Sequence, residues 1–279
     1  MKLTKLLAPM AFALTISSYA FADEAYDVMK KFSTLKAPDY SESQMNLDVI
    51  EKSGKVDHQV MMQYGNRKNG LINTVFEFVT SKESKGTRVL QMEKTAKDDD
   101  RWIYMPSLRQ TRRIPSSERS KSFVGCEFTY NDMSIRHVDD DTHEMVNANE
   151  SITINGNTNG AKYGTATYNC WKIKSTPVKK STVEYSYRYS WIDKNTYLPV
   201  KMEYYDKKDT SKLYKTFIIE KVETVTGATG IKYPLRRSCL ITNEITGRKT
   251  RVSVTNIKWD KKIPDSYFTQ NWLTTGKAK

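Results

Sequence analysis

Apolar and polar residues alternate along most of this chain, and the period of the alternation changes once, close to the N-terminus. In "DEAYDVMKKFSTLK" the apolar residues recur every three or four positions, which predicts an amphipathic helix with one apolar face: Ala25, Val28, Met29, Phe32 and Leu35. Asp23 and Glu24 precede the lysines of this segment, as the helix dipole favours. We expect Pro38 to stop the helix.

From there to the C-terminus the period is two, which is typical of half-buried antiparallel strands. Turns are expected at Ser53-Gly54-Lys55 and near Gly86, and "TINGNTNGAKYG" is polar and glycine-rich enough for a long hairpin loop. Roughly ten strands, with no alternation of strands and helices, predict one large antiparallel sheet that is strongly curled or partly closed. "IPDSYFTQNWL" is expected to end the chain as a short helical or irregular segment.

The clearest alternation is in "TVEYSYRYSWID", which predicts a strand with an aromatic inner face. That face would carry Val183, Tyr185, Tyr187, Tyr189 and Trp191. The other face would carry Glu184, Ser186, Arg188 and Ser190. Tyr and Trp bury area while keeping a polar tip that needs a partner. Such a face is either an ordinary core under the helix or the lining of a space for an apolar ligand with a polar end.

The N-terminus predicts export. Lys2 and Lys5 precede an apolar run, and Ala20-Phe21-Ala22 follows it with the spacing of a cleavage site. Residues 1–22 therefore read as a cleavable signal peptide, and residues 23–279 as a single domain without a dividing linker. The first run is too short for a comfortable membrane span, and no later run approaches the length of one.

The net charge of +13 points to anionic partners. "RWIYMPSLRQTRRIP" interleaves aromatic residues with arginines, as surfaces that bind nucleic acid do. An exported protein rarely meets nucleic acid, so lipid head groups, glycolipids or an acidic protein face are the better candidates. One loop contains five cationic residues and a single acidic residue, Glu118. Its cationic residues would form a basic rim or partner patch: Arg109, Arg112, Arg113, Arg119 and Lys121. The alternative is a long loop pinned by local ion pairs.

Three cysteines leave two readings of the redox state. Cys170 and Cys239 both lie in strand-like sequence, so an oxidising compartment favours a disulfide between them, with Cys126 left over. Three buried free thiols are the alternative, since free cysteine often behaves as a small core residue. The spacings do not resemble those of a zinc site.

Catalytic motifs are missing from the sequence. It contains no G-x-S-x-G, H-E-x-x-H or C-x-x-C and no phosphate-cradling glycine loop, so we expect neither an enzyme nor a cofactor. "RHVDDDTHE" crowds the residue types that ligate a divalent metal. Runs of this kind are usually a solvated charged edge, and we expect no metal here. "KDDDRW" is read as an exposed turn whose carboxylates answer nearby arginines.

The segment "DDRWIYMPSLRQTRRIPSSERSKSFVGCEFTYNDMS" resembles the signature of the outer-membrane lipoprotein-sorting proteins, relatives of the periplasmic carriers LolA and LolB. The pattern is roughly W-x-Y-x-P, then R-R-I, then a Ser-rich basic turn, then F-x-G-x-x-F-x-Y-x-D. It is met by Trp102, Tyr104, Pro106, Arg112, Arg113, Ile114, Phe123, Gly125, Phe128, Tyr130 and Asp132. "WIDKNTYLPVKMEYYD" and "IPDSYFTQNWL" are similar to later parts of the family, so the likeness covers nearly all of residues 23–279.

This resemblance implies a mainly β (α+β) fold, a half-open, strongly curled antiparallel β-barrel wrapped over a few helices, with a hydrophobic cavity for acyl chains. It also implies a non-enzymatic periplasmic carrier that sorts lipidated proteins or lipids to the outer membrane, and relatives are linked with RND-type lipid exporters. The alternative is an accessory subunit of an RND-type envelope lipid transporter. We expect a monomer that contacts membrane surfaces transiently.

The residues of the cavity come from the pattern of this chain and not from the resemblance. We expect acyl chains to lie between the first helix and the aromatic inner faces of two strands, against Phe32, Trp102, Tyr104, Tyr185, Tyr187, Tyr189 and Trp191. The arginines that follow Tyr104 would begin the rim of that cavity and meet an anionic head group or an acidic docking surface.

Overall fold

The computed structural model describes residues 13–80, 83–95, 99–134, 136–157 and 160–277. Within these ranges the chain forms two α-helices and thirteen strands. The helices are α1 (Ala13–Ser33) and α2 (Gln270–Thr275). The strands are β1 (Tyr40–Ile50), β2 (Val56–Lys68), β3 (Leu71–Phe78), β4 (Arg88–Met92), β5 (Asp100–Met105), β6 (Gln110–Arg113), β7 (Asp141–Asn155), β8 (Thr165–Pro177), β9 (Tyr185–Asp193), β10 (Pro199–Asp206), β11 (Leu213–Thr226), β12 (Lys232–Asn243) and β13 (Lys249–Trp259).

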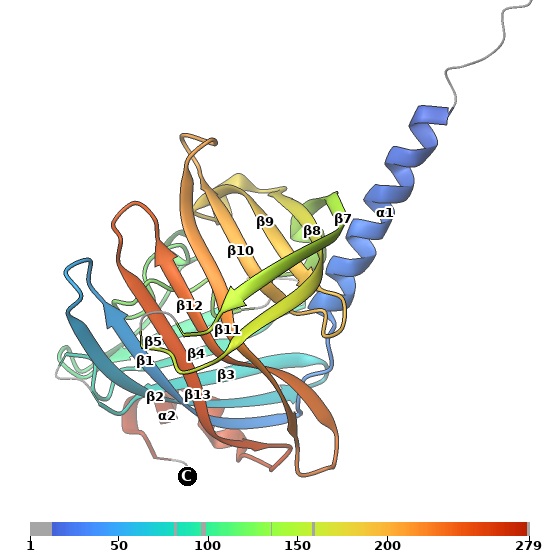
Figure 1. Ribbon diagram of the computed structural model, residues 1–279. Helices are drawn as coiled ribbons and strands as arrows, with labels where there is room; N and C mark the ends of the chain where they lie inside the picture. Colours follow the sequence, from blue (N-terminus) through green and yellow to red (C-terminus); the bar gives the residue numbers. More distant parts are fainter. Residues whose placement is uncertain (1–12, 81–82, 96–98, 135, 158–159, 278–279) are drawn as a thin grey trace, which may run out of the picture.

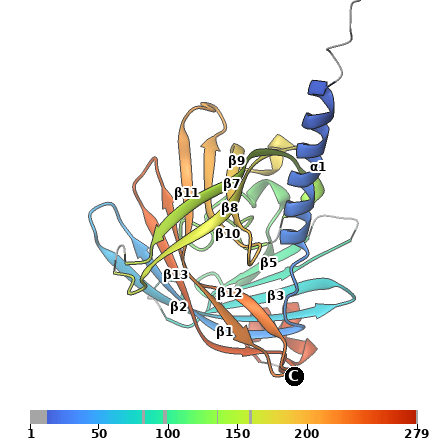
Figure 2. The ribbon, with the colours of Figure 1, turned by 45° about the vertical axis from the view of Figure 1, so that its right-hand side comes forward.

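All thirteen strands belong to one antiparallel sheet with the order β6-β5-β4-β3-β2-β1-β13-β12-β11-β10-β9-β8-β7. The chain runs from β1 outward to the edge strand β6, crosses to the opposite edge at β7, and returns until β13 pairs with β1. The sheet curls without closing, so β6 and β7 remain its two edges (Figures 1 and 2). The predicted half-open, curled antiparallel fold is confirmed.

The sequence underestimated the number of strands but placed the turns well. β6 has only four residues, too few for a period-two pattern to stand out. The turns at Ser53-Gly54-Lys55 and Gly86 join β1 to β2 and β3 to β4, as expected. The predicted hairpin loop joins β7 to β8, and α2 follows a short 3₁₀ segment, Asp265–Phe268, in the predicted C-terminal ending.

Helix α1 covers one end of the concave face of the sheet. Ala25, Val28 and Met29 are buried against Ile173 and Ile192 from β8 and β9, which confirms this part of the predicted apolar face. Leu35 lies beyond the end of the helix and packs against the main core. The expected stop at Pro38 is wrong, because the helix already ends at Ser33 and a short linker leads from there to β1. At its other end α1 runs back through the predicted cleavage position, and cleavage stays a prediction. In the described ranges, no helix has the length and apolar character needed to cross a membrane.

The main core lies on the concave face, where both halves of the sheet contribute. Leu47, Met61 and Phe78 come from β1 to β3, and Phe217 and Ile241 come from β11 and β12. A sheet that curls brings these distant strands over one shared interior, so one cluster of buried side chains joins the first and last parts of the chain.

The convex face of β3 to β5 is covered by the C-terminal segment. Trp272 and Leu273 of α2 pack there against Val75 and Leu90. Arg88 lies between α2 and the sheet, 5.5 Å from the centroid of the Trp272 ring, and its Nη1 donates to the carbonyl of Leu273 at 3.0 Å. Both faces of this part of the sheet are therefore buried.

The β7–β8 hairpin covers a second part of the convex face (Figure 1). Near the hairpin loop, a methyl group on Gly156 would lie 2.6 Å from the carbonyl oxygen of Glu220 on β11, so the two backbones nearly touch. Beneath the hairpin, the buried Arg251 donates from Nε to Glu220 at 2.8 Å, and Ser238 donates to the same carboxylate at 2.9 Å. This hairpin thus closes over a buried ion pair on the convex side.

Substituting Trp272 by Ala should destabilise the protein by about 3–5 kcal/mol, because it removes a large buried side chain from the contact between α2 and the sheet. Chemical denaturation followed by intrinsic fluorescence measures this. The matched control is Asn271→Ala on the exposed side of the same helix, which should change stability by less than about 0.5 kcal/mol. Equal effects of the two variants would contradict the docking of α2.

Candidate functional site

The stretch that joins the two edges of the sheet lies inside the concave face. We call residues 114–134 the crossover segment; the structure gives it one short 3₁₀ turn, Ser116–Glu118, and no strand. It fills the interior with five buried apolar side chains: Ile114, Phe123, Cys126, Phe128 and Tyr130. The Phe123 ring meets that of Phe76 on β3 edge to face, with 5.4 Å between the centroids. The expected acyl-chain cavity is thus occupied by the protein's own chain.

A tight turn places the aromatic residues of this segment. Val124 and Gly125 both have positive φ angles, 49° and 84°, and glycine adopts that region without steric cost. Within this turn the N–H of Phe123 donates to the carbonyl of Phe128 at 2.7 Å. The backbone of Phe123 therefore needs no partner strand while its ring points inward. Phe123 and Phe128 therefore enter the core from one compact loop.

The crossover segment is fastened to β12 and β13 through Glu127. The N–H of Glu127 donates to Thr250 Oγ1 at 2.9 Å. Its carboxylate accepts from Arg248 Nη1 at 2.6 Å and from Asn243 Nδ2 at 3.1 Å. Apart from Ile114, whose N–H donates to the carbonyl of Arg101 on β5, the segment has no pairing with a strand that the structure describes, and these contacts satisfy the polar groups of Glu127.

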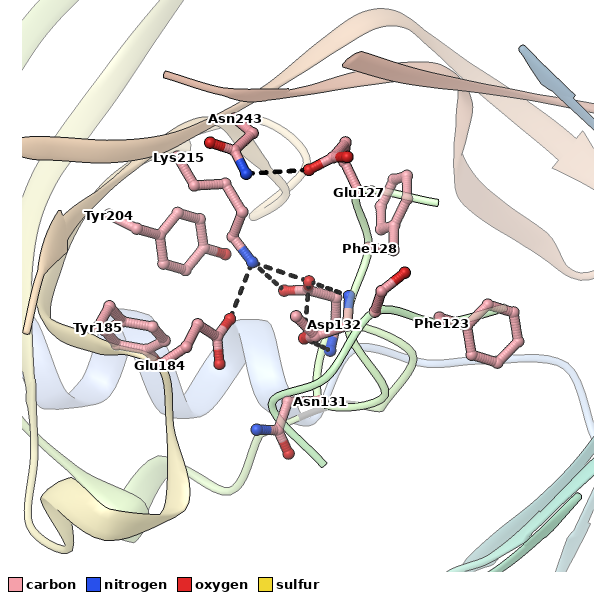
Figure 3. A network of polar contacts seen from close by, with 12 residues as sticks. Phe123, Glu127, Phe128, Asn131, Asp132, Glu184, Tyr185, Tyr204, Lys215 and Asn243 are labelled. Atoms are coloured by element: carbon pink, nitrogen blue, oxygen red, sulfur yellow. Dashed lines mark hydrogen bonds and ion pairs between the residues drawn. The ribbon is translucent and has the colours of Figure 1, made fainter. Parts of the chain in front are cut away.

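A buried lysine holds the other end of the segment (Figure 3). Lys215 Nζ on β11, with a side chain 2% exposed, lies 2.9 Å from Asp132 of the crossover segment and 2.9 Å from Glu184 before β9. Burial alone lowers the pKa of Lys215, but the two carboxylates together raise it well above its ordinary value, so the ammonium form persists. Its charge also lies 4.7 Å from the centroid of the Tyr204 ring.

A second ionic cluster lies beside the first. Arg188 on β9 pairs with the buried Asp141 at 3.0 Å and donates to the hydroxyl of Tyr185 at 2.7 Å. Arg136, which follows the crossover segment, donates to the same Asp141 at 2.8 Å. In the two clusters three cations face three carboxylates, so the interior carries charge without a net excess.

Two hollows flank the linker between α1 and β1. One, of ≈ 80 Å³, lies on the concave face and is lined by Ala37, Pro38, Ser41, Gln63, Gly65, Asn66, Arg67, Ile72 and Thr74. The other is an open depression of ≈ 480 Å³ beside the C-terminal turns of α1, lined by Asp27, Lys30, Lys31, Thr34, Leu35 and Lys36. The linker residues from Thr34 to Pro38 separate the two.

The predicted aromatic face of β9 is only partly on the inside. Val183 and Tyr185 are buried in the main core as expected. Tyr187, Tyr189 and Trp191 instead lie on the convex face, and there Arg188 and Ser190 take the inner positions. The cause is a β-bulge, because β9 uses three residues where β10 uses two between the pairs Tyr185–Asp206 and Arg188–Tyr204. One extra residue moves each following side chain of the strand to the opposite face of the sheet.

The displaced aromatic residues form a ladder on the convex face. Tyr187 stacks on Tyr205 with 4.6 Å between ring centroids, and Lys172 lies 4.7 Å from the Trp191 ring. Trp191 itself is buried, and its Nε1 donates to Glu150 of the β7–β8 hairpin at 2.8 Å. These three residues cannot line the interior.

The other predicted cavity residues are also outside the main core. Trp102 and Tyr104 alternate with Ile103, and only Ile103 faces the interior; the two aromatic residues pack beneath α2. A period-two pattern does not tell which of two buried faces is the inner one. Phe32 is half-buried and packs with the cluster of α1, Ile173 and Ile192, at one end of the concave face.

The predicted basic rim lies at the short edge strand β6 and is held by local ion pairs. Arg112 pairs with Glu118 at 3.0 Å and Arg113 with Asp100 at 2.6 Å. Lys121 also lies near Glu118, at 3.6 Å, and Arg119 donates to the carbonyl of Asp99 at 2.7 Å. Arg109 is exposed at the preceding turn. The expected pairing of the carboxylates of "KDDDRW" with arginines is confirmed by the Asp100 pair, but Asp100 begins β5 and is half-buried, so the exposed turn is not found there; Lys97 and Asp98 lie outside the described residues.

The predicted Cys170–Cys239 disulfide is wrong, because all three cysteines are free. Cys170 on β8 faces the convex side and Cys239 on β12 faces the concave core. Three strands separate β8 from β12, so the two residues are four strand spacings apart, roughly 19 Å along the sheet. A disulfide needs Cα atoms within about 7 Å.

The segment "RHVDDDTHE" has a structural use. Asp141 receives the two arginines described above, and Asp139 accepts from the hydroxyl of Tyr26 on α1 at 2.9 Å. His143 contacts Ser175 and the carbonyl of Val138 through its two ring nitrogens, and burial lowers its pKa. Among the described residues, no group of three or more acidic, His or Cys side chains is placed to hold a metal ion.

The charged residues of the interior were not predicted from the sequence. Lys215 shares its face with Phe217 and Ile219 by strict alternation, so the pattern alone could have placed a lysine in the core. Arg188 could not be found this way, because the bulge hides its face. Asp132 belongs to the family pattern, but its partner is 83 residues away in the chain.

Comparison with known proteins places the chain in a family. Residues 70–275 match a family model whose description reads "uncharacterized protein". The chain belongs to this family. None of the curated proteins matches the chain.

Solved structures share the fold over nearly the whole chain. A DUF1329 family protein from Desulfovibrio piger is 24% identical with a TM-score of 0.76, covering 91% of this chain and 99% of its own. A putative outer membrane lipoprotein-sorting protein domain from Vibrio parahaemolyticus is 22% identical with the same TM-score and coverages. A LolA superfamily protein from Nitrosomonas europaea is 16% identical with a TM-score of 0.60, covering 91% and 98%. The LolA-like fold that the resemblance implied is thereby confirmed.

Replacing Lys215 by Met should destabilise the protein by about 3–5 kcal/mol, because Asp132 and Glu184 would remain buried without their cation. Urea unfolding measures the change. Lys212→Met, at an exposed position of the preceding turn, is the matched control and should have little effect. A Lys215→Met protein as stable as this control would contradict the buried ion pair.

Thiol titration should find three reactive thiols per unfolded chain and slow reaction in the folded protein. Burial raises the pKa of Cys126 and Cys170 to about 12 and that of Cys239 to about 11, so the reactive thiolate is scarce at pH 8. Alkylation with iodoacetamide, with and without denaturant, measures both states. If only one thiol per chain reacted in denaturant, the result would support a disulfide between Cys170 and Cys239.

Proposed function

We propose that this protein is a non-enzymatic periplasmic carrier that binds the acyl chains of lipids or lipidated proteins on the concave face of its sheet. One observation carries the proposal: this apolar face is covered by an irregular loop, the crossover segment, where a closed barrel would have paired strands. A loop without strand pairing can leave the face while the sheet keeps its hydrogen bonds. The LolA-like fold and the predicted signal peptide support the same reading.

Ligand binding is then an exchange of one apolar occupant for another. In the free protein Phe123 and Phe128 cover the interior. An acyl chain contributes about 0.8 kcal/mol for each buried methylene group, so a chain of ordinary length offsets the loss of these contacts. The ion pair between Asp132 and Lys215 opposes the exchange and keeps the interior closed when no ligand is present.

The exposed part of the basic rim supports contact with anionic surfaces. Arg112 and Arg113 keep 45% and 57% of their side chains exposed despite their ion pairs. Such a patch at a sheet edge favours transient binding to a membrane surface or to an acidic donor protein, such as the periplasmic part of an RND-type exporter. We propose that the carrier acts as a monomer and delivers its cargo toward the outer membrane.

Asp132→Asn should bind acyl ligands about tenfold more tightly than the wild type, because it weakens the closed state that competes with ligand. Displacement of a fluorescent fatty acid from delipidated protein measures the affinity. Asp209→Asn removes the same charge from an exposed turn and is the matched control. Equal affinities of the two variants would contradict displacement of the crossover segment.

A second candidate function is favoured by the same packing. If the crossover segment never leaves, the protein is an accessory subunit of an envelope lipid transporter, with a solid core and the basic rim as its docking surface. Neither the wild type nor Asp132→Asn would then take up acyl ligands. Instead, binding to the periplasmic part of the transporter would weaken with rising salt concentration.

A further inference from the structure

The hollow of ≈ 80 Å³ on the concave face lies beside a glycine, Gly65, at a tightly packed point of the sheet. Ser41 of β1, Gly65 of β2 and Thr74 of β3 are cross-strand neighbours in one row. A Cβ atom on Gly65 would lie 2.5 Å from Ser41 Oγ and 3.2 Å from Gln63 Nε2. The linker residues Ala37 and Pro38 also line the hollow.

The lining of this hollow is rich in hydrogen-bond donors. Arg67 contributes a guanidinium whose buried Nε has no hydrogen-bond partner in the part of the chain that the structure describes. Ser41 Oγ already accepts from Gln63 Nε2 at 3.1 Å, which leaves the Ser41 hydroxyl proton for another acceptor. None of the nine lining residues is acidic. A buried donor without an acceptor is unfavourable, so the site is incomplete without an anion.

The hollow also continues into the apolar interior. The next cross-strand row holds Ser43, Gln63 and Phe76, and Phe76 belongs to the main core. The row after it brings Met61 and Phe78. A molecule with its anionic end beside Arg67 would therefore extend its apolar part along the surface that the crossover segment covers.

We propose that the hollow around Arg67 is a binding site for a phosphate-type oxyanion. A guanidinium forms paired charge-assisted hydrogen bonds with such a group, and the hydroxyls of Ser41 and Thr74 can donate to its remaining oxygens. The volume exceeds that of one water molecule, about 30 Å³, and suits one tetrahedral anion rather than a sugar. Resting on the proposed function, this makes the cargo an acyl lipid with a phosphate head group.

Isothermal titration calorimetry with three probes tests the site. The probes are dihexanoyl phosphatidic acid, dihexanoylglycerol with the same tails and no phosphate, and inorganic phosphate. The proteins are the wild type, Arg67→Gln, and Lys68→Gln, which removes a neighbouring exposed charge as the matched control. Gly65→Ala displaces Ser41 Oγ, one of the proposed donors, without changing the charge. Melting temperatures of the four proteins check that each is folded.

We expect Arg67→Gln to bind phosphatidic acid about tenfold more weakly than the wild type and Lys68→Gln, with unchanged binding of dihexanoylglycerol. Gly65→Ala should weaken phosphatidic acid binding similarly. If Arg67→Gln binds both lipids as the wild type does, the anion site is wrong and the carrier stands. If inorganic phosphate binds the wild type and not Arg67→Gln while neither lipid binds, the site takes free phosphate and the carrier proposal is wrong. If the wild type binds none of the three probes, both proposals are wrong.

Discussion

A sheet that curls without closing leaves an apolar concave face, and the rest of this structure depends on how that face is covered. The strand order puts β6 and β7 at opposite edges, so the chain between them has to pass from one edge to the other. In doing so it carries Phe123 and Phe128 into the interior. Helix α1 covers the remaining end of the face. The same crossing that completes the core therefore determines whether the interior can accept a ligand.

Apolar contacts and ion pairs hold the crossover segment in different ways. Burial of aromatic rings is favourable but nearly indifferent to direction, whereas a buried ammonium has to meet its carboxylates. Lys215 is placed by the sheet and Asp132 by the segment, so their contact selects one position among many that would bury the rings. A buried ion pair of this kind costs desolvation energy, but it fixes the position of the crossover segment. This suits a segment that has to return to the same closed position.

The residues that carry the family resemblance fall into two structural groups. Trp102 and Tyr104 pack on the convex face beneath α2. Phe123, Phe128 and Asp132 build and fasten the cover of the concave face. The pattern thus describes both faces of one region of the sheet and the loop that connects it to the opposite edge, and it is the second group that bears on ligand binding.

Sequence alone determined the elements whose cause is local: the apolar face of α1, the turns at Gly54 and Gly86, and the antiparallel, strand-rich fold. Spacing along the chain is enough for these, because a helix or a hairpin is built by near neighbours. Only the tertiary structure decided which side of each strand faces inward. A bulge in β9 turned Tyr187 and Tyr189 outward, and α2 buried the face of β5 that holds Trp102. The tertiary structure also paired Asp132 with Lys215 and separated Cys170 from Cys239. Such contacts depend on the order of strands across the sheet and not on distance along the chain.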